Sequence, residues 1–175
     1  MKLIKDIVHE GISNFSHDEE RKTVRVVLFD DNNLIALLYL KKYDFYMLPG
    51  GGIDEGETPE QAAKREAREE TGCSCEITHN LGVIKESNSK HNYFAASFCF
   101  VADVKREKGE PSYTDEECSE ETHVQWHSLH KALSLIENQV IDSAFFKDER
   151  ATAISRLVRE RDVVLLNEVN KRERG

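Results

Sequence analysis

The chain has 175 residues, a formal net charge of -9 and a sequence pI near 5.3. A hydrophobic content of 39% is enough for a buried core, so the length predicts a single domain over residues 1–175. The acidic balance argues against a protein that mainly binds duplex nucleic acid, because phosphate binding needs a basic surface. No apolar run approaches the roughly 20 residues of a membrane span, and the first residues are too polar for a signal peptide. We therefore expect a cytoplasmic protein without a membrane partner.

The cysteines and histidines do not predict a metal centre. The four cysteines are too few and too irregularly spaced for a disulfide framework, so reduced thiols are expected. A zinc site is a weak alternative at Cys73, Cys75 and His79, because a C-x-C pair without a second pair is not a typical zinc motif. The segment "THVQWHSLH" lacks an H-E-x-x-H pattern, which favours ordinary surface or core histidines.

The first predicted elements are two strands. Runs of β-branched and aliphatic residues at 23–29 and 34–40 flank the turn-rich cluster "DDNN". This pattern predicts a β-hairpin.

A helix is predicted to begin at Pro59 and to end before Gly72. Thr58 is a favourable N-cap, Gln61 completes a capping box, and Pro59 suits the first helical position. Gly72 is the expected left-handed terminator. Three consecutive glycines at 50–52 precede this helix, and they allow the backbone to approach a ligand or adopt strained dihedral angles.

One face of this helix carries three carboxylates. At 100° per residue, Glu66, Glu69 and Glu70 share a face that borders a stripe of small alanines suited to close packing on a sheet. A solvated face of Glu and Arg pairs is the alternative interpretation. Carboxylates at this spacing repel one another, and partial desolvation increases the repulsion. Carboxylate oxygens are preferred ligands of Mg²⁺ or Mn²⁺, so the face predicts a site for such a cation.

The second half of the chain alternates strands and helices. Residues 91–104 are apolar on both faces, which predicts a central, covered strand. Residues 105–121 read as a polar loop, "THVQWHS" as a short strand and "SLHKALSLIE" as a short helix. A C-terminal helix is expected at about 145–170. Its apolar stripe is predicted to pack on its own domain in preference to a homodimer interface; the stripe consists of Ile154, Leu157, Val158 and Leu165. The element order predicts an α/β sandwich.

The segment 51–73 resembles the signature of the Nudix (MutT-like) hydrolases. All charged and glycine positions match, whereas Ala67 and Cys73 are smaller than the usual aliphatic residues. The matching positions are Gly51, Glu57, Arg65, Glu66, Glu69, Glu70 and Gly72. The resemblance implies a Nudix-type α/β/α sandwich with a mixed β-sheet and hydrolysis of phosphorus-containing anhydrides.

The resemblance also implies roles for individual residues. Glu66, Glu69 and Glu70 hold the divalent metal, Mg²⁺ or Mn²⁺, and take part in catalysis. Glu57 and Arg65 brace the loop against the helix by an ion pair. Gly51, Gly52 and Gly72 are substrate-contacting or structural positions of the signature segment 51–73, which is called the box below. Many relatives add an acid from a loop ahead of a Trp-bearing strand, and Glu120 is the expected equivalent, with Glu117 and Glu121 as alternatives. The general base is Glu66 or Glu120.

The implied substrate is a small-molecule nucleoside diphosphate linked to another moiety. Residues 87–90 match neither the Pro of some ADP-ribose subfamilies nor the Tyr of some dinucleoside polyphosphate subfamilies. Four aromatic residues suit either base stacking or core packing: Tyr43, Phe45, Tyr46 and Trp126. The alternative function is a non-catalytic, nucleotide-binding regulatory domain. The complete set of acids argues for the enzyme, and either a monomer or a homodimer is compatible with the sequence.

Overall fold

The computed structural model describes residues 1–9, 20–105 and 109–173. Within them, seven strands form one mixed sheet in the order β1-β5-β6-β2-β3-β4, with β7 paired to β3. The strands are β1 (Leu3–His9), β2 (Arg21–Phe29), β3 (Ile35–Leu40), β4 (Phe45–Met47), β5 (Cys75–Asn88), β6 (Tyr93–Val104) and β7 (Thr122–His127). The helices are α1 (Pro59–Thr71), α2 (Asp115–Ser119), α3 (Leu129–Asn138) and α4 (Glu149–Glu173).

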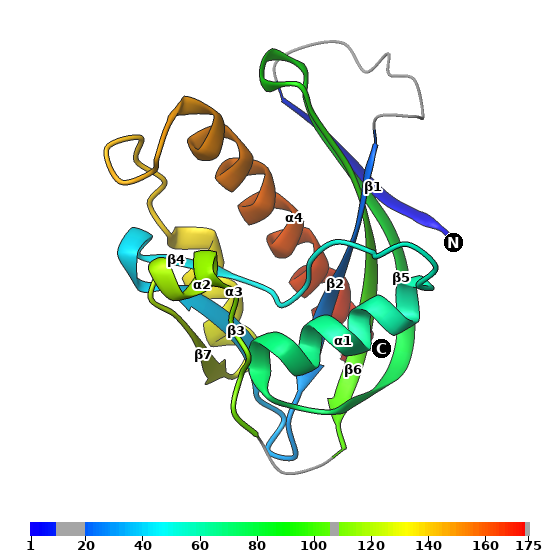
Figure 1. Ribbon diagram of the computed structural model, residues 1–175. Coiled ribbons are helices and arrows are strands. Elements are labelled where there is room, and N and C mark those ends of the chain that lie inside the picture. The colour runs from blue at the N-terminus through cyan, green and yellow to red at the C-terminus, as the bar shows by residue number, and fades with distance from the viewer. Residues whose placement is uncertain (10–19, 106–108, 174–175) are drawn as a thin grey trace.

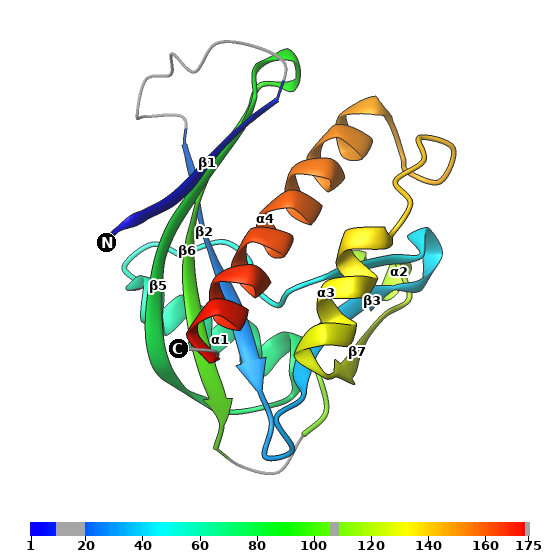
Figure 2. The ribbon, with the colours of Figure 1, turned by 180° about the vertical axis from the view of Figure 1, so that it is seen from behind.

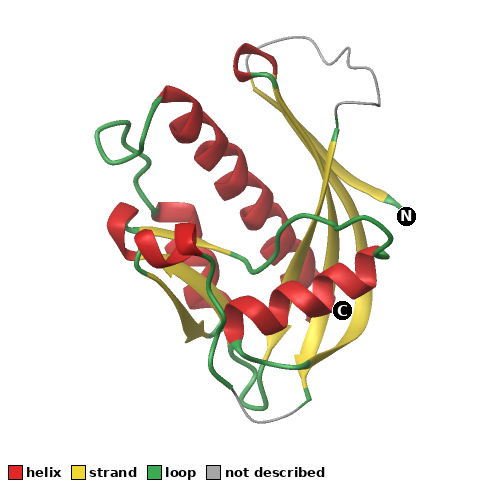
Figure 3. Ribbon diagram, viewed as in Figure 1, coloured by secondary structure: helices red, strands yellow, loops and turns green. Residues whose placement is uncertain are grey.

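Helices cover both faces of the sheet. Figure 1 shows α1 in front of the strands, and the reverse view in Figure 2 shows α3 and α4 on the other face. Figure 3 shows the same view with the helices in red and the strands in yellow. The predicted α/β/α sandwich with a mixed sheet is confirmed. The predicted central strand is also confirmed, because β6 lies between β5 and β2.

The sheet forks between β2 and β3. The predicted hairpin is present but short, because β2 and β3 pair antiparallel only at Phe29 and Ile35, next to the turn, and then diverge. β2 instead pairs along its whole length with β6 in parallel, and β3 pairs with β4 and β7. The fork leaves one edge of β2 open, and the glycine-rich segment occupies it.

Three strands of the sheet were not predicted: β1, β4 and β5. At three residues, β4 is too short to show a pattern. β5 is the longest strand, at 14 residues, and β1 pairs with it in parallel. Both carry many polar residues, and β5 contains Gly82 at φ 131° and register shifts against β6. These irregularities break the period-2 alternation by which a strand is recognised.

Two helical regions differ from expectation. The predicted polar loop at 105–121 contains the short helix α2, while residues 106–108 lie outside the described residues. α4 begins at Glu149 instead of about residue 145, because the Asp148 side chain accepts a hydrogen bond from the Ala151 N–H at 2.7 Å and so caps the helix.

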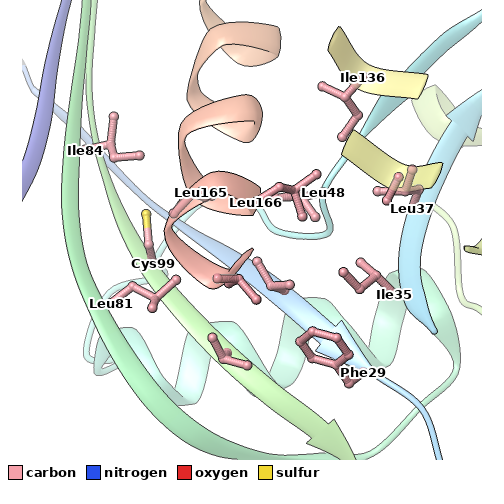
Figure 4. Packing of buried hydrophobic residues seen from close by; sticks show 14 of the residues in the cluster. Phe29, Ile35, Leu37, Leu48, Leu81, Ile84, Cys99, Ile136, Leu165 and Leu166 are labelled. Carbon is pink, nitrogen blue, oxygen red and sulfur yellow. The ribbon is translucent and has the colours of Figure 1, made fainter. Parts of the chain in front are cut away.

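The core consists of one apolar cluster on each side of the sheet. The larger cluster packs α3 and α4 against the strands, and Figure 4 shows its members, including Leu48, Ile136 and Leu165. Leu157 and Leu165 are fully buried in it, so these two residues of the α4 stripe pack within their own chain, as predicted. Val158 is also buried, whereas Ile154 is only partly buried. The smaller cluster places three alanines of α1 against β2 and β6. None of the helices in the described part of the chain is both long and apolar enough to cross a membrane.

Candidate active site

Helix α1 is fixed at both ends by the predicted signals. Thr58 accepts a hydrogen bond from the Gln61 N–H, and the Gln61 side chain accepts one from the Thr58 N–H, which completes the capping box. Gly72 ends the helix at φ 72°. Ala62, Ala63 and Ala67 have no exposed surface, so α1 lies close to the sheet and its glutamates emerge at the rim of the contact.

The glycine loop, residues 49–52, runs along the open edge of β2. The Val24 N–H donates to the Gly51 carbonyl and the Val26 N–H to the Pro49 carbonyl, both at 2.9 Å. A side chain at Gly50 has no room, since a Cβ there lies 2.1 Å from the Val24 carbonyl oxygen, and its φ is +140°. The loop is therefore held between β2 and α1.

Arg65 connects this loop to α1. Its Nε and Nη2 donate to the two carboxylate oxygens of Glu57 at 2.8 and 2.9 Å, so the predicted Glu57–Arg65 ion pair is present. Nη2 also donates to the Gly52 carbonyl at 2.9 Å. Nη1 reaches Glu66 at 2.8 Å and Glu69 at 3.1 Å. The hydrogen bonds from Arg65 lower the pKa of Glu57.

Glu70 is the most buried of the three box carboxylates. Its side chain accepts a hydrogen bond of 2.6 Å from the Gly50 N–H. Burial, and then the nearby charge of Glu66, raise the Glu70 pKa well above its usual value. Burial likewise raises the pKa of Glu66, against the opposing effect of Arg65. Glu69 is half-exposed, with 47% of its side chain accessible. Two carboxylates thus lie partly desolvated and close enough to repel each other.

The three box carboxylates are a suitable donor set for a hard divalent cation, because all their donors are anionic oxygens. They are not gathered around one point, however. In the described residues, no group of three or more His, Cys, Asp or Glu side chains is arranged to hold a metal ion. Glu66 and Glu69 turn toward Arg65, and Glu70 turns toward the Gly50 N–H. The carboxylate oxygens are therefore suitable ligands for the cation, but the three side chains must change orientation to bind it together.

The acids around α2 occupy different environments. Glu117 closes a capping box on Thr114, and its charge is among those that raise the Glu70 pKa. Glu120 lines a cavity of about 350 Å³, and its pKa is raised by burial and then by Glu116. Glu121 is exposed and pairs with Lys41. The charge of Glu117 therefore acts on Glu70, whereas Glu120 lines the cavity.

Two cavities flank the first turns of α4. The 350 Å³ cavity contains Tyr43, which stacks on Phe146 with ring centroids 5.1 Å apart. Phe45 lines the same cavity but is 97% buried, while Tyr46 stacks on Tyr39 and Trp126 packs against the smaller core cluster. A second cavity, of about 310 Å³, shares three residues of α4 with the first: Arg150, Ile154 and Val158.

Sequence reasoning missed a buried charged network beneath the site. Arg161 and Asp162 of α4 have no exposed surface, and Arg161 contacts Glu86 of β5 at 3.4 Å. Arg25 of β2 is 8% exposed. The sequence carries only a weak signal for this network, because isolated charged residues in a helix or strand normally lie on the surface.

All four cysteines carry free thiols, and three of them are buried. His123 and His127 lie in β7.

Comparisons with known proteins agree with this fold. The NUDIX domain family model matches residues 19–148. An ADP-ribose pyrophosphatase from Methanocaldococcus jannaschii is 34% identical over 80 residues, 44% of this chain and 47% of that protein. An oxidized purine nucleoside triphosphate hydrolase from Danio rerio is 35% identical over 82 residues, 47% of this chain and 48% of that protein. The chain thus spans about half the length of these curated relatives.

A solved structure supports the same architecture. A NUDIX hydrolase from Nitrosomonas europaea superposes with a TM-score of 0.56 at 16% identity, covering 82% of this chain and 90% of that one. At this identity the likeness concerns the fold. Because the family model covers most of the chain and includes the whole glycine loop and α1, the chain belongs to the NUDIX family.

Proposed function

We propose that this protein is a divalent-metal-dependent pyrophosphohydrolase that cleaves a nucleoside diphosphate linked to another moiety. The observation that carries the proposal is the pairing of Glu70 with the glycine loop: a buried carboxylate, repelled by Glu66, contacts the Gly50 N–H and no cationic side chain in the described residues. Burying a carboxylate without a cationic partner raises the free energy of the folded state, and a cation bound at that position offsets this increase. The names of the relatives as pyrophosphatase and nucleotide hydrolase support the same reaction class.

In this proposal Glu66, Glu69 and Glu70 hold Mg²⁺ or Mn²⁺. The cation supplies positive charge that neutralises phosphate oxygens and makes water more acidic. Arg65 holds the Gly52 carbonyl and Glu57, and so fixes the loop on which the diphosphate rests. Glu66 or Glu120 accepts the proton of the attacking water at a carboxylate oxygen. The pKa of each is raised by burial, which makes both better proton acceptors than an exposed glutamate.

The cavity beside Glu120 is the proposed place for the nucleoside. Tyr43 and Phe146 are parallel to within 10°, and they offer an aromatic edge at the cavity wall. We further propose that the protein works in the cytoplasm, since a reducing compartment suits its four free thiols.

The test is a hydrolysis screen of nucleotide sugars, dinucleotides and oxidised nucleotides with Mg²⁺ or Mn²⁺. The proposal predicts release of a nucleoside monophosphate that stops when a chelator is added. Glu60→Gln is the matched control for substitutions of the box acids, because Glu60 is an exposed acid of the same helix. Tight nucleotide binding with no hydrolysis of any diphosphate would favour the regulatory alternative.

A further inference from the structure

The 310 Å³ cavity is lined by three arginines. Arg21 and Arg25 come from β2 and Arg150 from the first turn of α4, with Tyr93 and Ile154 among the apolar walls. No Asp or Glu is among the described residues that line it. A concentration of positive charge is notable in a protein of net charge -9. A cavity of this sign favours anions.

Arg25 is the buried member of the group. It is 92% buried, and its Nη1 donates to the carbonyl of the adjacent residue, Val24, at 2.7 Å. Its Nε has no hydrogen-bond partner in the described part of the chain, and no carboxylate there lies within ion-pair distance of its nitrogens. A buried cation without an anionic partner is costly by several kcal/mol. Arg25 therefore lines the cavity and keeps an unused donor at its buried Nε.

The other two arginines also keep donors available. Arg150 uses its Nε for the His91 carbonyl at 3.2 Å, which holds the side chain over the cavity. Within residues 1–9, 20–105 and 109–173, the terminal nitrogens of Arg150 form no ion pair. The guanidinium group of Arg21 forms none there either. Guanidinium groups bind phosphate oxygens through paired hydrogen bonds, so three of them around one cavity suit a phosphoryl group.

Arg25 links the wall of this cavity to the glycine loop. The Arg25 Cα lies against the glycine loop, 3.0 Å from where a Cβ on Gly50 would stand. Its positive charge also acts on Glu66 and Glu70, the two box carboxylates nearest the loop. Arg25 therefore lies beside the glycine loop with its backbone and lines the cavity with its side chain.

We propose that Arg25, Arg21 and Arg150 form a second anion subsite, which binds a phosphate of the substrate outside the scissile diphosphate. The inference rests on the proposed function. Such a subsite favours substrates with three or more phosphoryl groups over those whose distal half is an uncharged sugar. The competing explanation is that Arg25 only balances the buried charges of Glu86 and Asp162. In that case the cavity binds no anion.

The first experiment needs neither metal nor activity. The metal-free full chain is titrated with inorganic phosphate, with sodium chloride at equal ionic strength as reference, while NMR follows the arginine Nε–H signals. The Arg25 signal is expected to shift and saturate with phosphate alone. Arg150→Gln is expected to weaken phosphate binding about tenfold. Arg156→Gln, an exposed arginine of α4 outside both cavities, is the matched control and should change affinity by less than about twofold.

The second experiment identifies the source of the phosphate. For a nucleoside triphosphate, Arg21→Gln, at an arginine that lines only the 310 Å³ cavity, should raise KM about tenfold with little change in kcat, whereas the KM for ADP-ribose should stay within about twofold. Equal increases for both substrates overturn the assignment to a distal phosphate. Absence of an Arg25 shift, or equal weakening by Arg156→Gln, overturns the subsite even if the enzyme is active. A phosphate-dependent Arg25 shift in a protein that hydrolyses nothing supports the subsite and refutes the proposed function instead.

Discussion

The backbone N–H of Leu48 donates a hydrogen bond of 2.9 Å to Oδ2 of Asp162, which joins the residue before the glycine loop to the middle of α4. Both residues have no exposed surface. The other carboxylate oxygen of Asp162 accepts from the Arg161 Nε at 2.7 Å. The C-terminal helix, far from the box in sequence, therefore fixes the base of the loop that faces the box acids.

Replacing Asp162 with Ala is expected to lower the free energy of unfolding by about 3 kcal/mol, because it leaves the Arg161 guanidinium and the Leu48 N–H without this acceptor. Urea denaturation measures the change. Asp31→Ala, at an exposed turn, is the control and should stay within about 0.5 kcal/mol. If Asp162→Ala lowers the free energy of unfolding by no more than Asp31→Ala does, the buried network does not hold the loop.

Two adjacent glycines provide a second, paired prediction. A Cβ on Gly51 would lie 2.4 Å from Oε1 of Glu66, whereas a Cβ on Gly52 would meet only Nη2 of Arg21, at 3.8 Å. Gly51→Ala should therefore displace the Glu66 carboxylate and lower turnover about 100-fold, an effect typical of a misplaced catalytic group. Gly52→Ala should retain activity within about threefold. Similar activities for the two variants would argue against a precise position for Glu66.

The raised pKa of Glu70 predicts a pH dependence of stability in metal-free protein. Burial and the charge of Glu66 make folded Glu70 bind its proton more tightly than the unfolded chain does. The folded state therefore gains stability from this group as pH falls from the raised value toward 4.5, and loses it as pH rises through that window.

Glu70→Gln removes this dependence while preserving an acceptor for the Gly50 N–H. The variant should be more stable than the wild type at pH 8 in chelator, and the difference should shrink toward pH 5. Urea titrations at several pH values measure it. A difference that is constant with pH would mean that Glu70 is not desolvated in the folded protein.

The acids near α2 can be separated by substitution. Because Glu120 lies in the 350 Å³ cavity and Glu121 is exposed beside Lys41, Glu120→Gln should lower kcat about 100-fold, the scale of general-base catalysis. Glu121→Gln should leave kcat within about threefold. If instead Glu117→Gln alone reduces kcat, Glu117, whose charge acts on Glu70, replaces Glu120 as the proposed proton acceptor.

Local signals in the sequence were sufficient for α1 and insufficient for the sheet. The cap residues Thr58 and Gly72 and the alanine spacing act within a few residues, so the helix bounds followed directly from them. β5 and the fork beside β2 depend on pairing between distant segments, which no local pattern encodes. The buried Arg25 was invisible for another reason, since its position depends on α4 covering β2.

The central claim is that Glu66, Glu69 and Glu70 together hold the cation required for hydrolysis. The most direct measurement is the melting temperature of wild type, the triple variant Glu66→Gln/Glu69→Gln/Glu70→Gln and Glu60→Gln, each with and without Mn²⁺. An ion that binds only the folded state stabilises it by mass action, by about 2.7 kcal/mol when present at about 100 times its Kd. Mn²⁺ should therefore raise the melting temperature of wild type and of Glu60→Gln. It should leave the melting temperature of the triple variant unchanged. An equal rise in all three proteins would contradict the account.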